Sequence, residues 1–319
     1  MLTYLRKLSL GMTIASLSGA IALGISRPGQ AQYIITLPDG SRCEGQFQGY
    51  TGQGICEYED GYYRGQILNG LRHGRGLFYF RDRENAEADI NVPEVGTKLN
   101  EAEVTVFAVP LPSGNYVDVY EGDFRNGFPN GRGSFIYGND MRYDGEVKDG
   151  LPHGTGLFIY GSEGEYSYRY YGQVAEGLAN GRGSFVYATC QIYRDKPHCD
   201  RYDGQFRNGL PHGQGTFTYS ECAVVGQQVR CKRWSGQFFK GQPNGAGTLI
   251  FANGDRCQGQ FNDLTLSGRG NCSYSNGNRY SGELRDGQPH GMGTMRYSDG
   301  RTYSGEFRGG NPIGSLGSN

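Results

Sequence analysis

Eight cysteines are the residues of this 319-residue chain best suited to covalent or metal chemistry. A structural zinc site usually takes its ligands from Cys-x₂₋₄-Cys pairs. The closest cysteines here, Cys190 and Cys199, are nine positions apart. The spacing therefore favours disulfides over a metal centre, and no metal ligand is predicted.

Four of the five histidines occupy the same position of a repeated segment. Asparagine fills that position in other copies, and a catalytic or metal-binding role could not be shared equally by the two side chains. Both residues suit a turn fixed by hydrogen bonds. We expect a structural role for this set, which comprises His73, His153, His212 and His290 and the alternates Asn130, Asn180 and Asn244. The fifth histidine, His198, lies between Cys190 and Cys199 and is expected to be a solvated loop residue.

The sequence contains no arrangement typical of catalysis or cofactor binding. It lacks the G-x-x-x-x-G-K-[ST] motif that cradles phosphates. Carboxylates such as Glu121 and Asp144 stand beside repeated glycine or aromatic positions, which is typical of a solvated face rather than of a pair in a cleft. We predict no catalytic residue, no cofactor and no enzymatic activity.

The dominant feature is a segment that recurs about ten times. In the copy that begins at Tyr120, Gly122 and Phe124 follow at every second residue, so the three side chains share one face of a strand. The stretch RNGFPNG then supplies the glycine, asparagine and proline of a hairpin turn. Each copy is therefore predicted to be a β-hairpin. The first residue of each copy, here called the slot residue, is Cys43, Tyr63, Tyr120, Tyr143, Tyr171, Tyr202, Trp234, Cys257, Tyr280 or Tyr303.

The high content of glycine (55 residues) and tyrosine (24 residues) has one structural explanation, the packing of rings on glycine backbone. A glycine close to the slot residue leaves room for an aromatic ring to lie against the backbone. Disorder would not place glycine at the same position in every copy. The predicted aromatic face comprises Tyr63, Tyr120, Tyr143, Tyr171, Tyr202, Trp234, Tyr280 and Tyr303. The other face becomes more polar toward the C-terminus, from Leu157 and Ile159 to Thr216 and Thr218.

These repeats resemble those of the MORN family. Four segments carry the family's Y-x-G, internal glycine and H/N-G-x-G elements: YEGDFRNGFPNGRGSFIY, YDGEVKDGLPHGTGLFIY, YDGQFRNGLPHGQGTFTY and YSGELRDGQPHGMGTMRY. The resemblance covers roughly residues 41–315 apart from an insertion at about 81–118, and it departs at Cys43, at Cys257 and in the turn NDLTLSG. The expected fold is all-β: an elongated, twisted, single-layer antiparallel sheet of about ten stacked hairpins. The resemblance implies a module for protein interaction or dimerisation, with lipid binding proposed for some members.

Hairpin register predicts how the cysteines pair. If the central glycines of a hairpin face each other, the two cysteines of the first copy are also opposed, and so are those of the eighth copy. Between hairpins, the remaining cysteines face each other if Tyr187 lies opposite Tyr202 and Tyr219 lies opposite Trp234. Opposed strand residues are within reach of a disulfide. The four predicted disulfides are Cys43–Cys56, Cys190–Cys199, Cys222–Cys231 and Cys257–Cys272.

The first 31 residues have the pattern of a cleaved secretory signal. Arg6 and Lys7 precede an apolar run from Leu8 to Ile25, and a small-x-small site ends at Ala31. A retained membrane anchor is the alternative, since 18 apolar residues are at the lower limit for spanning a bilayer. The predicted organisation is a signal at 1–31, two repeats at 32–80, an insertion with an exposed loop and a partial hairpin at 81–118, the remaining repeats at 119–315 and a flexible tail at 316–319.

The formal net charge is −1, and it becomes −4 once Arg6, Lys7 and Arg27 are removed. A nucleic-acid partner would require a basic stripe and is not predicted, whereas an anionic membrane surface is only mildly disfavoured. Because disulfides persist in oxidising compartments, we expect a non-enzymatic exported scaffold, periplasmic or secreted and of bacterial origin, that binds an unidentified protein or itself as a homodimer. The alternative is an envelope-surface module that binds lipid headgroups or glycans.

Overall fold

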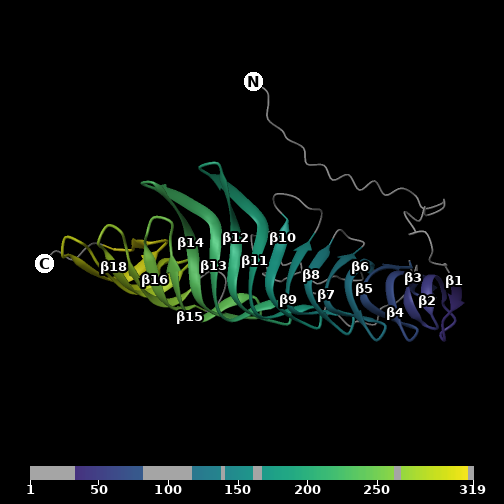
Figure 1. The fold of residues 1–319 in the computed structure, drawn as a ribbon. Coiled ribbons are helices and arrows are strands. Elements are labelled where there is room, and N and C mark those ends of the chain that lie inside the picture. The colour runs from purple at the N-terminus through teal and green to yellow at the C-terminus, as the bar shows by residue number, and fades with distance from the viewer. Residues whose placement is uncertain (1–32, 82–116, 138–140, 161–166, 262–266, 315–319) are drawn as a thin grey trace, which may run out of the picture.

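The computed structural model describes residues 33–81, 117–137, 141–160, 167–261 and 267–314. Within these ranges the chain is all-β and forms one long, curved sheet whose first and last strands lie at opposite ends (Figure 1). None of the described residues forms a helix that could cross a membrane. The strands are β1 Tyr33–Thr36, β2 Arg42–Gln48, β3 Thr51–Tyr58, β4 Gly61–Leu68, β5 Leu71–Phe80, β6 Val117–Arg125, β7 Phe128–Tyr137, β8 Arg142–Lys148, β9 Leu151–Tyr160, β10 Tyr168–Ala175, β11 Leu178–Tyr193, β12 Lys196–Arg207, β13 Leu210–Val225, β14 Gln228–Phe239, β15 Gln242–Ile250, β16 Arg256–Phe261, β17 Gly268–Ser273, β18 Arg279–Arg285, β19 Gln288–Arg296, β20 Thr302–Arg308 and β21 Asn311–Pro312.

The strands pair antiparallel in chain order, and each of the ten predicted copies forms one hairpin, from β2–β3 to β20–β21. This confirms the predicted fold class. The strand β1, which pairs with β2, was not predicted because the segment YIIT lacks the repeat motif. The predicted signal, most of the insertion and the C-terminal tail lie outside the described residues.

A continuous row of glycines crosses the sheet, because the central glycines oppose each other both within hairpins and between them. Gly122 lies opposite Gly133, and Gly133 lies opposite Gly145 on the next hairpin. A methyl group added to Gly133 would overlap the ring and the Oη atom of Tyr120. The slot tyrosine therefore lies flat over its glycine pair and occupies the space that any other side chain would need.

Hydrogen bonds hold the slot tyrosines in this position. The Oη atom of Tyr143 donates to the carbonyl oxygen of Glu146 at 2.6 Å and to that of His153 at 3.1 Å. Tyr63 contacts the carbonyl oxygen of His73 in the same way, at 3.0 Å. The repeated histidine thus contributes its backbone oxygen to the fold, which explains why asparagine can replace it.

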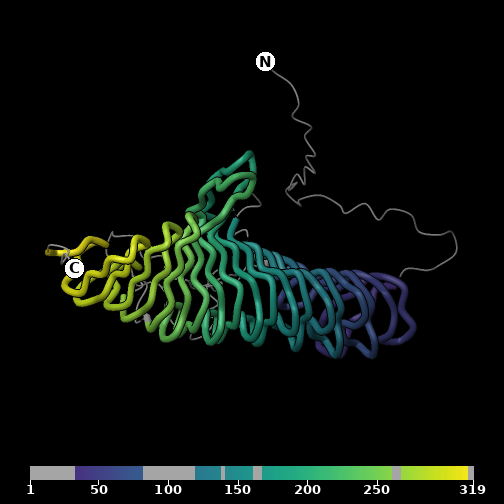
Figure 2. The backbone as a smooth tube through the Cα atoms, turned by 90° about the vertical axis from the view of Figure 1, so that its left-hand side faces the viewer, coloured from purple at the N-terminus to yellow at the C-terminus, as the bar shows by residue number. Residues whose placement is uncertain are grey.

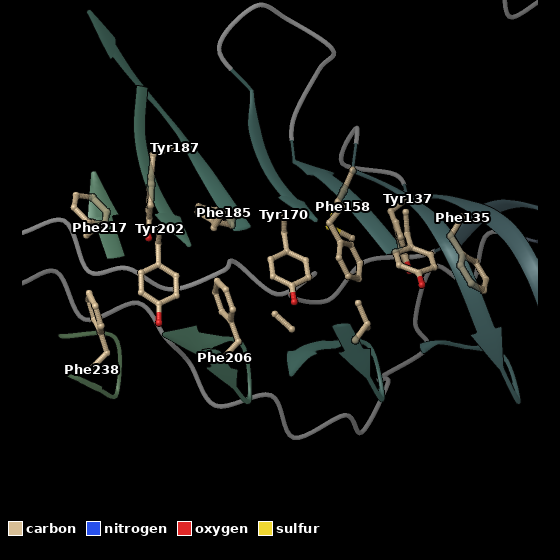
Figure 3. Packing of buried hydrophobic residues seen from close by; sticks show 14 of the residues in the cluster. Phe135, Tyr137, Phe158, Tyr170, Phe185, Tyr187, Tyr202, Phe206, Phe217 and Phe238 are labelled. Atoms are coloured by element: carbon tan, nitrogen blue, oxygen red, sulfur yellow. The ribbon is translucent and has the colours of Figure 1, made fainter. Parts of the chain in front are cut away.

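Aromatic contacts link each hairpin to the next. The ring of Tyr202 makes edge contacts with Phe206 of its own hairpin, at a centroid distance of 5.0 Å, and with Phe238 of the following hairpin, at 4.7 Å (Figure 3). Tyr63 contacts Phe124 likewise, at 4.9 Å. Each such pair contributes about 0.5–1.5 kcal/mol beyond burial. The core is therefore a chain of rings along the sheet, and the largest fully buried side chains are Trp234, Tyr63, Tyr120, Tyr143, Tyr170, Tyr202, Tyr280, Phe78, Phe135, Phe158, Phe185 and Phe217.

The prediction that Tyr171 belongs to the aromatic face is wrong. Its side chain is 62 % exposed, whereas that of Tyr170 is fully buried and lies over Gly172 and Gly183. Tyr170 is the residue two positions before the glycine, as in the other copies. Because successive strand residues point to opposite faces, an error of one position exchanges the buried and the exposed side chain.

The predicted opposition of Tyr187 to Tyr202, and of Tyr219 to Trp234, is also wrong. Phe185 lies opposite Tyr202, and Phe217 lies opposite Trp234. The register then shifts between Val186 and Cys190, and again between Thr218 and Cys222, as a β-bulge does. The two bulges restore the register in which the cysteines of β11–β12 and β13–β14 face each other.

Replacing Gly133 by alanine tests the packing of tyrosine on glycine. The new methyl group would collide with Tyr120, so we expect a loss of about 1–3 kcal/mol, as for overpacked cores. The matched control is Ser134→Ala on the opposite face, with an expected change within about 0.5 kcal/mol. Chemical denaturation of the oxidised protein measures both, and equal midpoints for the two variants would contradict the packing described above.

Alkaline pH should unfold the sheet through its buried tyrosines. Burial raises the pKa of Tyr58, Tyr219 and Tyr274 to about 12, above the usual value of about 10. The folded state holds these protons more tightly than the unfolded state. The contribution of the three tyrosines to the free energy of unfolding is therefore fully present below about pH 10 and is lost as the pH rises toward about 12. In an alkaline titration, we expect the circular dichroism signal of the β-sheet to disappear over the same pH range in which the tyrosinate absorbance of the buried residues rises. Complete tyrosinate absorbance with an unchanged β-sheet spectrum would show that these tyrosines are not held by the fold.

Candidate functional site

Two pairs of strands are longer than the rest and project from the sheet (Figures 1 and 2). β11 and β13 have 16 residues each, and β12 and β14 have 12 each. We call residues 188–200 the first arm and residues 220–232 the second arm. The arms are an addition to the repeat, since no other described strand has more than 10 residues.

The four predicted cysteine pairs are all bonded, and no cysteine is free. Their Cα atoms are 3.8–4.0 Å apart. Cys190–Cys199 crosses the first arm and Cys222–Cys231 crosses the second arm. The other two pairs, Cys43–Cys56 and Cys257–Cys272, lie in the buried core.

The tips of the two arms are hydrogen-bonded to each other. The guanidinium of Arg194 donates to the carbonyl oxygens of Gln227, at 2.6 Å, and Gly226, at 2.7 Å. The backbone N–H of Cys222 donates to the Oη atom of Tyr193 at 3.1 Å. Two disulfides and these contacts make the arms one projecting unit.

His198 is not the solvated loop residue that the sequence predicted. It lies in β12, is half-buried, and its Nδ1 atom is 3.7 Å from Cys231 Sγ. The contact joins the two arms, and no local pattern in the sequence signals it. The ligand atoms of His198, Cys222 and Cys231 lie within 4.8 Å of one another. Because the two sulfurs form a disulfide, only the imidazole could bind a metal in this state.

The four repeated histidines are held apart by the fold. His73, His153, His212 and His290 lie in β5, β9, β13 and β19, one to a hairpin. Strands in a sheet are separated by about 4.8 Å, so even the nearest two of this set are several strands apart. The fold does not bring these side chains together.

The face opposite the aromatic core, here called the outer face, carries an open groove in its C-terminal half. Its floor is the glycine row, and the residues beside the glycines carry mostly hydroxyl and amide groups. The volume is about 1070 Å³. The polar lining residues include Ser235, Thr248, Gln258, Gln260, Asn271, Ser281, Thr294 and Ser304.

An arginine row runs along the outer face beside the glycine row. The residue directly before the slot residue is arginine in six successive hairpins, and each of these side chains is exposed. Aligning the copies on their glycines reveals this regularity in the sequence, but only the strand register shows that the side chains form a line. The row comprises Arg142, Arg169, Arg201, Arg233, Arg256 and Arg279.

Acidic side chains lie on the outer face, as the sequence suggested. Asp144 pairs with Arg142 at 2.7 Å, and Asp203 pairs with Arg201 at 2.6 Å. These pairs are largely exposed, and each is worth at most about 1 kcal/mol. They neutralise part of the arginine row.

A further set of polar residues was missed by the sequence interpretation. Three positions after the slot residue, Asp123, Glu146, Gln173 and Gln205 accept hydrogen bonds from the backbone of the opposite strand, at 2.7–3.2 Å. Each caps the bulge formed by a glycine with positive φ, such as Gly131. The signal was available, because this position always holds an acceptor side chain.

Comparison with known proteins agrees with this geometry. The family model described as MORN repeat matches residues 63–83, 120–142, 143–165, 170–189, 202–221, 234–256 and 280–300. The hairpins that it does not match begin at β2, β16 and β20. The first two carry cysteine in the slot, and the last ends in a strand of 2 residues.

No curated protein sequence matches the chain. Several solved structures match, among them a selenomethionine-substituted virginiamycin B lyase from Staphylococcus aureus, with 11% identity over 88% of this chain and 85% of that chain. Its TM-score of 0.15 does not indicate a shared fold. The seven matched repeats and the continuous sheet of hairpins decide the assignment: the chain belongs to the MORN-repeat family.

Proposed function

We propose that this protein is a non-catalytic, exported scaffold that binds another protein, or a second copy of itself, through its arms. The observation that carries this proposal is the exposure of apolar side chains on a projecting unit. Ile192 is 56 % exposed and Val224 is 50 % exposed, each close to the tip of its arm. MORN repeats form a generally non-catalytic family, which supports a binding role.

The aromatic face is not available to a partner. Its slot residues are buried against their own glycines and against the rings of neighbouring hairpins. A partner therefore has the outer face and the arms to bind. The arms project from the sheet (Figure 1) and carry exposed apolar side chains near their tips, which are Ile192, Val224 and Val225. Exposed apolar groups favour protein contacts.

The disulfides fix the conformation of the arms before a partner binds. A hairpin that is already fixed loses little conformational entropy when a partner binds it. The contact of Arg194 with Gly226 and Gln227 fixes one arm relative to the other. The arms therefore present a surface that is organised in advance.

Export is the second part of the proposal. All eight cysteines are paired in the fold, and disulfides persist mainly in oxidising compartments such as the periplasm or the extracellular space. The residues 1–31 that would direct export lie outside the described residues, and their role stays a prediction.

A second candidate function is a surface-binding module for envelope glycans or lipid headgroups. The exposed arginine row is the observation that favours it. A line of cations at a regular interval would attract an anionic surface or polymer.

Site-specific photo-crosslinking tests the scaffold function. A photoreactive residue placed at Ile192 or Val224 in the full chain, expressed in an exporting bacterium, should give a discrete adduct, because the partner must contact the arm tips. The matched control is Leu68, which is 41 % exposed but lies far from the arms at the end of β4. Mass spectrometry then assigns the adduct to a second copy or to another protein.

The proposal also requires the arms to be intact. Replacing Cys190 and Cys199, or Cys222 and Cys231, by serine should weaken the adduct, since the tips would lose their fixed conformation. No adduct from either arm position, or equal adducts from the arms and from Leu68, would refute a role of the arms in binding.

A further inference from the structure

We propose that the C-terminal half of the outer face binds an extended acidic polysaccharide. The binding element is the part of the arginine row formed by Arg233, Arg256 and Arg279, together with Arg296 on the strand that follows. This proposal rests on the second candidate function and names the ligand class that the residues can recognise.

The strand register places these arginines on one line. Arg233 lies opposite Ile250, which lies opposite Arg256. Arg256 lies opposite Ser273, and Ser273 lies opposite Arg279. Arginines on alternate strands are therefore separated by about 9.6 Å, twice the strand spacing of about 4.8 Å. The interval is repeated, because the hairpins are equivalent.

These arginines lack the carboxylates that neutralise the earlier part of the row. Two residues after Arg142 and Arg201 the chain has Asp144 and Asp203, whereas Ser235, Gln258 and Ser281 occupy the equivalent positions in the later hairpins. Among the described residues, Arg233, Arg256, Arg279 and Arg296 make no ion pair with a carboxylate. Their guanidinium groups are free to bind an anion.

One pair of these arginines is placed unfavourably for an isolated sheet. Arg279 lies directly opposite Arg296, and both side chains are exposed on the same face. Like charges in directly opposed positions destabilise a strand pair. An anion bound between the two guanidinium groups would remove this repulsion, and guanidinium is well suited to carboxylate.

The net charge of the C-terminal part of the chain is also positive. Residues 227–319 contain 11 basic and six acidic residues, a net charge of +5, whereas residues 32–226 carry −9. The two parts of the chain therefore carry opposite net charges. An acidic polymer would be attracted to the C-terminal part and repelled by the rest.

The groove beside the arginines offers the other groups that a sugar chain needs. Ser281 and Thr294 lie opposite each other one step from the Arg279–Arg296 pair, toward the glycine row. Side chains of this kind donate and accept hydrogen bonds with sugar hydroxyls. The glycine floor leaves an open groove across several hairpins, and a single extended polysaccharide chain could lie in it.

The periodicity favours a polysaccharide over a peptide or a membrane surface. An identical cation at a constant interval matches a polymer whose acidic group recurs at a constant interval, and a linear polysaccharide with one carboxylate per disaccharide has this property. A peptide would need a particular sequence to match the row. A bilayer presents its charges on a plane and would make no use of the groove.

Calorimetric titration with hyaluronan oligosaccharides tests this assignment, because they carry one carboxylate per disaccharide. For the oxidised full chain from an exporting host, we expect affinity to rise with each added disaccharide until the row is filled, and to fall with salt. Chitin oligosaccharides, which are neutral, should bind much more weakly. The triple variant Arg233→Gln, Arg256→Gln, Arg279→Gln should lose about tenfold or more in affinity, since each lost pair is a charge-assisted hydrogen bond.

The control variant removes the same charge elsewhere. Arg207, Arg285 and Arg308 are exposed at the turn ends of their strands, about 20 Å from the arginine row by strand rise. Replacing these three by glutamine should leave the affinity within about twofold. Circular dichroism and a denaturation midpoint verify that both triple variants are folded.

Three results would overturn the proposal. They are the absence of hyaluronan binding, equal losses in the two triple variants, and co-sedimentation with phosphatidylglycerol vesicles in place of polysaccharide binding. The last result would identify a lipid surface as the ligand of the same arginines. The photo-crosslinks at Ile192 and Val224 do not depend on the arginine row, so a failure here is distinguishable from a failure of the scaffold function.

Discussion

The tyrosine ring that lies over two opposed glycines is the interaction on which this structure depends. A single-layer sheet has no second layer to bury its apolar side chains, and the described part of the chain has only one sheet. The glycines solve this problem, because a ring such as that of Tyr143 can lie flat on the backbone of Gly145 and Gly156. The ring is then covered by aromatic residues of its own and adjacent hairpins, so the sheet supplies its own core.

Two hairpins show what replaces the ring when it is missing. In β6–β7 the slot residue Tyr120 lies opposite Phe135, whereas in β2–β3 the equivalent positions hold Cys43 and Cys56. The hairpin β16–β17 has a cysteine pair at the same positions. A covalent bond thus stands where two rings would pack. These are also two of the hairpins that the family model does not match, because that model describes the aromatic form of the repeat.

The repeat itself could be predicted from the sequence because its physics is local. Alternation fixes the face, glycine and asparagine fix the turn, and the opposed glycines fix the register from which Cys43–Cys56 and Cys257–Cys272 follow. The pairs Cys190–Cys199 and Cys222–Cys231 were predicted from an opposition of aromatic residues that is wrong, and the bulges change the register before these cysteines are reached. Errors arose where the local pattern was ambiguous or interrupted. Tyr170 and Tyr171 are adjacent, and only the distance to Gly172 distinguishes them. The contact of His198 with Cys231 depends on the approach of two arms, which no spacing along the chain encodes.

The two faces of the sheet are under different constraints, and this separates folding from recognition. A side chain on the aromatic face must fit against glycines and rings, so its identity is largely set by the fold. On the outer face, Asp144 can become Ser281 in a later hairpin without any change in the buried layer, because alternate residues point away from it. Such an exchange alters only charge and hydrogen bonding. A stack of nearly identical hairpins can therefore carry an acidic, self-neutralised surface over one part of its length and a cationic groove over another, with the same core beneath both.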